Sequence, residues 1–587
     1  MSALVNALDN FTPTQIGENC HVEYGWSNSI KEKILQFSFQ VTRTDDNGVK
    51  KLQVILMDML DILNQKHELS SDEESKSYLK ILYKMIGQTR DIIDGKGEYT
   101  LTYMMIYAWY KVYPELSFFA LKCLVDLGDK TLHQYGSWKD IKYFCRYVKT
   151  QTYDENHPLI KYAISLVNIQ LRKDNVDTFN VSLAAKWVAR EGSSFDWLFT
   201  HLATDYFSEY MKTAISGTSH ARALLKCKTQ YRKLLSSLNK LIDTLQIKQC
   251  NNNWADIKFT KVTSISLAKQ KRAFMNIKQN GDIRHSESLD RISCANNFKF
   301  HIERSLKGEI EMKGKRLGMT DFTKQALELL HYSNEQITYE TQLQLDLLNS
   351  QWRDNSKQTG ALGNFIAMVD VSGSMSGNPM YAANALGIRI AEKSKLGKRV
   401  MTFSAAPAWV NLDDCNNFVS MTKKICTDSG LNTNFYAALD LILDAIIQSK
   451  LSPDDVQDMV LVILSDMQLD KADKTMNQTM YDSIKTKYEA AGIRLYGKPF
   501  KPPHILLWNL RSTSGFPTIS TQPNASMMSG FSPALLNLFC DKGIDALQSC
   551  TPWSILTQSL ENERYKIMGN KLAEILYTLE DLKWDKL

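Results

Sequence analysis

Oxygen-bearing side chains gather directly after a short apolar segment of the chain. Asp370-Val-Ser-Gly-Ser374 follows Asn364-Phe-Ile-Ala-Met-Val369, so one carboxylate and two hydroxyls share a single loop. Hard cations such as Mg²⁺ prefer oxygen ligands, and hydroxyls with few carboxylates leave such a cation with room for a further acidic ligand. The pattern predicts a divalent-cation site. Its alternative is that these residues only cap helices and close turns, as Ser and Asp often do.

Two later residues extend this set. Thr433 precedes an expected helix over residues 435–449, and Asp466 follows the apolar segment 459–464. In parallel α/β sheets, ligands bind beyond the carboxyl ends of the strands. We therefore predict that one metal site is built from five residues and holds Mg²⁺, or Mn²⁺ or Ca²⁺ in its place: Asp370, Ser372, Ser374, Thr433 and Asp466.

The elements that position these residues differ between the two halves of the chain. After residue 363, short apolar strands alternate with helices, and the unbroken apolar run 459–464 is typical of a strand buried on both faces. Before residue 351, apolar residues recur at helical spacing almost throughout. The expected fold is α + α/β multidomain. We expect an α-helical domain over 1–355, a doubly wound α/β domain over 362–550, and a C-terminal helix over 551–587 that packs back on the chain.

A basic segment stands out in the helical half. Residues 212–278 hold fourteen Lys and Arg against two acidic residues, and Lys226, Lys233 and Lys240 recur every seven residues. Positions seven apart lie near one helix face, so these lysines form a stripe. Such a stripe suits nucleic-acid phosphates, and nearby aromatics suit stacking on bases. The alternatives are a solvated helix face and aromatics that belong to a core. The candidate RNA contacts are Arg222, Lys226, Lys233, Lys240, Lys258, Lys261, Lys269, Lys271 and Arg272.

Two resemblances follow from these residues. The Asp-x-Ser-x-Ser loop, followed by Thr433 and Asp466, resembles the metal-ion-dependent adhesion site (MIDAS) of von Willebrand factor A-type (vWA) domains. The helical half resembles the TROVE/Ro-like family, and most closely its uncharacterised relatives in plants, fungi and giant viruses. Four segments carry that likeness: 90–97, 135–140, 182–192 and 231–235.

The TROVE/Ro-like resemblance implies a HEAT-like helical repeat, as a solenoid or a ring, joined to a vWA domain. It also implies RNA held on a basic helical surface, as in a ribonucleoprotein. The MIDAS resemblance implies that Ser372, Ser374 and Thr433 contact the metal directly, with the two aspartates acting directly or through water. Many vWA domains work without metal, so an empty site is the alternative.

Other functions lack sequence support. The chain shows no HExxH, GxSxG, Walker A or kinase pattern, so we expect no catalytic residues and no enzymatic activity. Ten scattered cysteines without a CxxC pair suggest reduced thiols. No signal peptide or membrane span is evident, so we expect a cytoplasmic protein without a membrane partner or small-molecule substrate. RNA is the first expected partner. The alternative is a scaffold whose metal captures an acidic residue of a partner protein.

Overall fold

The structure is a computed structural model that describes most of the 587-residue chain. The described ranges are 11–18, 20–70, 72–212, 214, 216–332, 338–403, 407–426, 435–457, 459–468, 479–540 and 542–584.

The described part of the chain begins with a small antiparallel hairpin, β1 (Thr14–Ile16) and β2 (Val22–Tyr24), and then runs through helices up to residue 356. These helices are α2 (Ile30–Gln40), α3 (Asp46–Ser70), α4 (Glu73–Arg90), α5 (Thr100–Val112), α6 (Pro114–Cys123), α7 (Trp138–Thr152), α8 (Pro158–Val176), α9 (Ala184–Trp187), α10 (Asp196–Tyr206), α11 (Ser208–Lys212), α12 (Gly217–Ile242), α13 (Leu245–Cys250), α14 (Ser264–Phe274), α15 (Leu289–Leu306), α16 (Met319–Tyr332) and α17 (Tyr339–Ser356).

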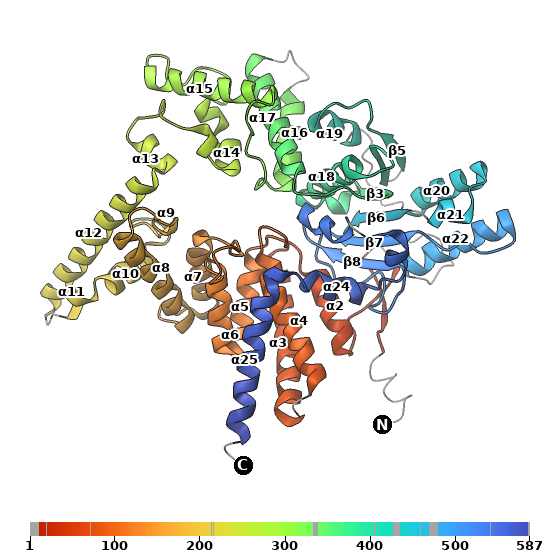
Figure 1. The fold of residues 1–587 in the computed structure, drawn as a ribbon, viewed down its shortest axis with the longest axis horizontal. Helices are drawn as coiled ribbons and strands as arrows, with labels where there is room; N and C mark the ends of the chain where they lie inside the picture. The colour runs from red at the N-terminus through yellow and green to blue at the C-terminus, as the bar shows by residue number, and fades with distance from the viewer. Residues whose placement is uncertain are drawn as a thin grey trace.

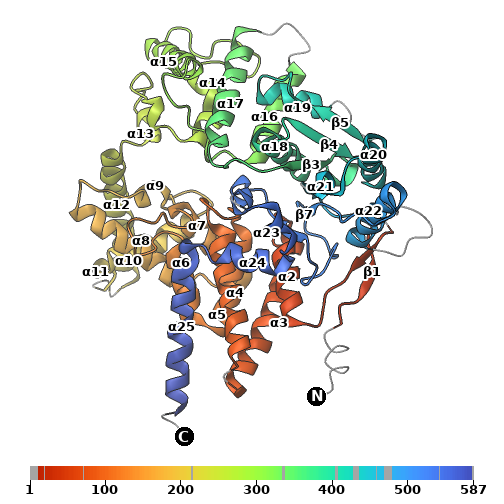
Figure 2. The ribbon, with the colours of Figure 1, turned by 45° about the vertical axis from the view of Figure 1, so that its right-hand side comes forward.

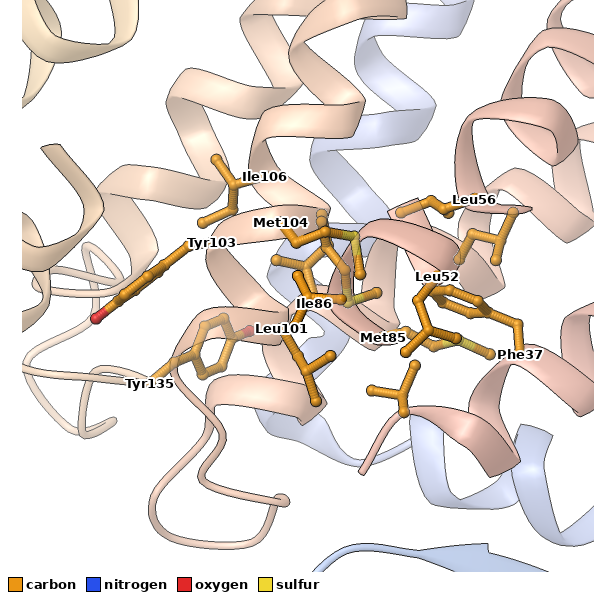
Figure 3. Packing of buried hydrophobic residues seen from close by; sticks show 14 of the residues in the cluster. Phe37, Leu52, Leu56, Met85, Ile86, Leu101, Tyr103, Met104, Ile106 and Tyr135 are labelled. Atoms are coloured by element: carbon orange, nitrogen blue, oxygen red, sulfur yellow. The ribbon is translucent and has the colours of Figure 1, made fainter. Parts of the chain in front are cut away.

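Side chains from the first helices form a common hydrophobic core. Figure 3 shows Phe37 of α2, Leu52 of α3 and Met85 of α4 gathered beside Met104 of α5. All four are at most 3 % exposed. The helical periodicity of this half therefore has the expected cause, because one face of each helix is buried against its neighbours.

The second half contains a six-stranded sheet in the order β5-β4-β3-β6-β7-β8. Its strands are β3 (Phe365–Asp370), β4 (Arg399–Phe403), β5 (Ala408–Asn411), β6 (Val460–Ser465), β7 (His504–Asn509) and β8 (Ala525–Ser529). All neighbours pair in parallel except β4 and β5. The predicted combination of a helical region with an α/β sheet is thus confirmed.

Helices cover both faces of this sheet. Along β3, Ala367 and Val369 join one hydrophobic core, whereas Ile366 and Met368 join the other. The strand sequences are therefore apolar without alternation, because neither face meets water. The remaining helices are α18 (Asn378–Lys393), α19 (Phe418–Cys426), α20 (Phe435–Ser449), α21 (Pro453–Gln457), α22 (Met480–Tyr496), α23 (Ile544–Gln548), α24 (Pro552–Leu560) and α25 (Glu563–Trp584), with 3₁₀ turns at Phe259–Lys261, Gly373–Met375 and Pro533–Phe539.

The last two helices of the chain, α24 and α25, pack against its first helices, α2 and α4. Figures 1 and 2 show the helices running from α2 through α12 to α14 and α17, then through the sheet and back to α2 and α4 by way of α24 and α25. Arg564 of α25 donates to Asp91 beyond α4 at 2.6 and 2.7 Å. The elements therefore follow one another around a closed circuit, in which the last helices of the chain contact the first ones. No helix in the described ranges is both long enough and apolar enough to cross a membrane.

Candidate functional site

The fold brings two of the predicted metal ligands together. Asp370 is the last residue of β3, and Asp466 directly follows β6. These two strands are neighbours, and the chain moves outward from them in opposite directions, to β4 on one side and to β7 on the other. This is the point of a doubly wound sheet where loops separate and ligands bind. Both carboxylates are fully buried there.

The loop after β3 is arranged around Asp370. The backbone N–H of Ser372 donates to Asp370 Oδ1 at 2.9 Å, and the Ser465 hydroxyl donates to Oδ2 at 2.6 Å. The hydroxyls of Ser372 and Ser374 are 3.1 Å apart. Ser372 is buried and Ser374 is exposed, so the site opens to solvent on the Ser374 side.

The electrostatics of this pair favour a cation. Burial, together with the nearby negative charge of Asp466, raises the pKa of Asp370 to about 7. A divalent cation would relieve both penalties, because burial disfavours an uncompensated negative charge and a like charge adds to that cost. Two carboxylates and two hydroxyls are all oxygen donors, as Mg²⁺ prefers. The donor set therefore fits a hard cation. Within the described ranges no group of three or more His, Cys, Asp or Glu forms a metal cluster. Thr433, the fifth predicted ligand, lies outside the described residues.

A positively charged side chain of the protein, Arg511, already contacts one of the two buried carboxylates, that of Asp466. Arg511 Nη1 lies 3.1 Å from Asp466 Oδ2, and Arg511 Nη2 lies 3.6 Å from Glu18 Oε2 in the N-terminal hairpin. Sequence reasoning missed Arg511, although its place two residues after β7 was a signal, because β7 ends at the same edge of the sheet. The hairpin gave no such signal.

The hairpin is fastened to the loop that carries Asp466. The backbone N–H of Glu18 donates to Gln468 Oε1 at 2.8 Å, and Gln468 Nε2 donates to Glu23 Oε2 at 3.0 Å. Tyr24 and Phe516 exchange backbone hydrogen bonds of 2.9 Å. An acidic side chain, Glu18, is thereby held beside the candidate metal site from within the same chain.

The predicted basic stripe lies on the surface of α12. Its members are all exposed: Arg222, Lys226, Lys233 and Lys240. None of the four forms an ion pair within the described part of the chain, whereas Lys228 and Arg232 of the same helix pair with Glu191 at 3.8 and 2.7 Å. Buried residues of α12, including Tyr231 and Leu238, lie on its other side. Lys226 Nζ also lies 3.9 Å from the Tyr210 ring centroid. The stripe is therefore a row of exposed cations without a carboxylate partner among the described residues.

The other predicted RNA contacts, between residues 258 and 272, differ from one another in their exposure to solvent. Lys258, Lys261 and Lys269 are exposed, and Arg272 is half-buried. Lys271 instead reaches α16, where it donates to Gln325 at 3.0 Å, and burial lowers its pKa to about 8. Lys271 is half-buried, like Arg272, and is therefore less accessible to an RNA phosphate than the exposed lysines; its role as an RNA contact stays a prediction.

The aromatic residues of this segment are Trp254, Phe259 and Phe274, and two of them are buried. Phe259 and Phe274 are at most 5 % exposed, and their ring centroids are 5.2 Å apart inside one hydrophobic cluster. The guanidinium of Arg291 lies 3.7 Å from the Trp254 ring centroid and so covers a face of that ring. Phe259 and Phe274 therefore belong to a core, and the stacking interpretation is wrong for these two. One face of the Trp254 ring is occupied, and stacking of a base on its other face stays a prediction.

Two domain models match separate parts of the chain. Residues 364–572, which carry the sheet, match a domain of unknown function, DUF7788, and residues 164–358 match another, DUF2828. The chain is also similar to "Uncharacterized protein L728" of Acanthamoeba polyphaga mimivirus. The two are 27 % identical over 515 residues, which span 84 % of this chain and 80 % of that protein.

Proposed function

We propose that this chain is a non-enzymatic RNA-binding scaffold protein, similar in architecture to the TROVE/Ro-like proteins. The observation that carries the proposal is the α12 stripe, whose four exposed cations have no acidic partner in the described ranges. Cations held apart from carboxylates keep their full charge for phosphates, and binding releases the counterions around RNA. The consecutive helices and the closed circuit of the chain support a ring of HEAT-like repeats.

The test is a charge reversal on the stripe. Lys226→Glu, Lys233→Glu and Lys240→Glu together should weaken binding of a fluorescein-labelled single-stranded RNA at least tenfold at low salt, and should reduce the slope of log K against log salt. The matched control reverses Lys450, Lys498 and Lys501, three exposed lysines at the far side of the sheet. Equal effects of the two triple variants would show only a response to net charge and would refute the stripe.

A second candidate function belongs to the sheet domain, which we propose to be of the vWA type with a MIDAS. The observation that favours it is the buried Asp370 and Asp466 pair at the point where the strand order reverses. Ser372 and Ser374 would complete the contacts, and the cation would supply an open position for an acidic group. Such a site would make the chain a protein-interaction scaffold.

Metal binding can be measured without knowing that partner. Titration with Mn²⁺, followed by electron paramagnetic resonance of the free ion, should show one site per chain that EDTA empties. Asp370→Asn and Ser372→Ala should abolish it, whereas Ser376→Ala, in the same loop but outside the donor set, should not. Wild-type binding that survives in Asp370→Asn would exclude this site as the location of the metal.

A further inference from the structure

A second basic surface lies on α7, outside the segment to which sequence reasoning pointed. A cavity of about 550 Å³ opens between the first turns of α3 and α5 and the exposed face of α7. Its walls include three tyrosines, Tyr99, Tyr143 and Tyr147, and two α7 cations, Lys139 and Arg146. Cavities of roughly 300–1,000 Å³ are the usual size of small-ligand sites.

The cations of α7 share one helix face and lack acidic partners. Lys139, Lys142 and Arg146 are spaced by three and four residues, so they project from the same side of the helix. None of them, nor Arg190 beside them, forms an ion pair with any residue in the described ranges. Burial lowers the pKa of Lys142, and the charges of Lys139, Arg190 and Arg146 lower it further. Like charges held this close repel one another, and an anion between them would relieve that repulsion.

The tyrosines stand beside these cations. Lys139 Nζ lies 5.1 Å from the Tyr99 ring centroid and 5.4 Å from that of Tyr143, and the Arg146 guanidinium lies 5.1 Å from the Tyr143 centroid. Tyr99 is exposed, and Tyr143 and Tyr147 are half-buried. Cations beside accessible aromatic rings are the combination that binds a phosphate together with a stacked base. An acidic peptide would satisfy the cations but would make little use of the rings. One carboxylate, Asp46, lies on the rim.

Buried contacts hold this surface in place. The Arg90 guanidinium lies 3.9 Å from the Tyr99 ring centroid and binds the buried Asp140 at the start of α7 through bonds of 2.6 and 2.9 Å. Asp140 also accepts from the Tyr103 hydroxyl at 2.8 Å. The first turn of α7 and the Tyr99 ring are thus fixed relative to each other before any ligand arrives, which lowers the entropy that binding must cost.

We propose that this cavity binds a nucleotide, with its base against Tyr99 and Tyr143 and its phosphate against Lys139 and Arg146. The nucleotide is either a free mononucleotide or one residue of single-stranded RNA. In the second case the inference rests on the proposed RNA-binding function.

Two probes distinguish the sources: a fluorescein-labelled twelve-residue oligouridylate and unlabelled UMP measured by calorimetry. Tyr143→Leu should weaken RNA binding about tenfold, since a stacked base contributes roughly 1–3 kcal/mol. Arg146→Glu should weaken it at least as much, and Tyr143→Phe, which keeps the ring, should bind like the wild type. Lys307→Glu, an exposed lysine at the end of α15, is the charge control. Thermal unfolding of each variant establishes that it folds.

The outcomes separate this inference from the proposed function. If the α12 reversal weakens RNA binding but Tyr143→Leu and Arg146→Glu do not, and UMP does not bind, the cavity proposal is overturned while RNA binding stands. If the wild type binds UMP but no RNA, and Arg146→Glu abolishes UMP binding, the cavity is a mononucleotide site and the proposed function fails. Loss of RNA binding in Tyr143→Leu with retention in Tyr143→Phe supports a stacked RNA base.

Discussion

Replacing Arg511 with Gln should tighten divalent-cation binding at the sheet edge. The Arg511 guanidinium sits 3.1 Å from Asp466 Oδ2, so it already neutralises one of the two carboxylates on which a metal would depend. A cation arriving at Asp466 must displace this contact or remain beside a positive charge. Gln keeps the length and polarity of the side chain and removes only the charge.

The size of the effect follows from Coulomb's law. Two unit charges 4 Å apart interact by about 4 kcal/mol at an effective dielectric constant near 20, and a dication doubles that figure. The Arg511 side chain is 38 % exposed, so water screens much of this repulsion. We expect a net gain of about 1.4–2.8 kcal/mol, which corresponds to roughly tenfold to hundredfold tighter binding.

The assay is the Mn²⁺ titration described above, at constant ionic strength. Arg494→Gln, an exposed arginine on α22, is the matched control and should leave the affinity unchanged. Adding Asp370→Asn to Arg511→Gln should erase the gain. Unchanged or weaker Mn²⁺ binding in Arg511→Gln would refute the reasoning, because Arg511 would then be a support of the site and not a competitor for it.

Two further predictions concern stability. Lys96 Nζ donates to Ser38 O, Val41 O and Ser529 Oγ at 2.9, 2.9 and 2.7 Å, and Ser529 Oγ also donates to Ser38 O at 2.8 Å. Lys96→Met should therefore leave one buried carbonyl without a donor and cost about 1–3 kcal/mol in urea unfolding, whereas the exposed Lys50→Met should cost almost nothing. Burial lowers the pKa of His504 to about 4. Between pH 6.5 and 4, the unfolded chain therefore binds a proton at His504 that the folded chain does not. The free energy of unfolding should accordingly fall by up to about 3 kcal/mol as the pH falls through this range. His504→Asn should flatten that part of the pH profile, and an unaltered profile would contradict the assignment.

Sequence patterns predicted those features that depend on residues close together in the chain. The apolar runs that became β3 and β6 were readable because both faces of the sheet are buried, and Asp370 and Asp466 followed from the ends of those strands. The lysine stripe of α12 followed from helical spacing alone. Each of these features depends on residues close together in the sequence, where periodicity carries the signal.

Contacts between distant segments were not readable in this way. Lys271 looked like its exposed neighbours in the sequence, and only its hydrogen bond to Gln325 of α16, 54 residues away, distinguishes it from them. The α7 cavity combines α7 with Tyr99 and the start of α3, and no spacing rule connects these segments. The hairpin strands of three residues each are too short for a periodic signal.

The segment between α4 and α5 shows how the two halves depend on each other. Arg90 binds Asp140 of α7, Asp91 binds Arg564 of α25, and Lys96 binds Ser529 of β8. The carbonyl of Ile92 also accepts from Arg316, which precedes α16. One short segment therefore contacts the α7 helix beside the cavity, the C-terminal helix and the edge strand of the sheet. The Arg90–Asp140 and Arg564–Asp91 contacts are buried ion pairs, so removing one partner of either pair leaves the other charge buried without compensation, at a cost of several kcal/mol.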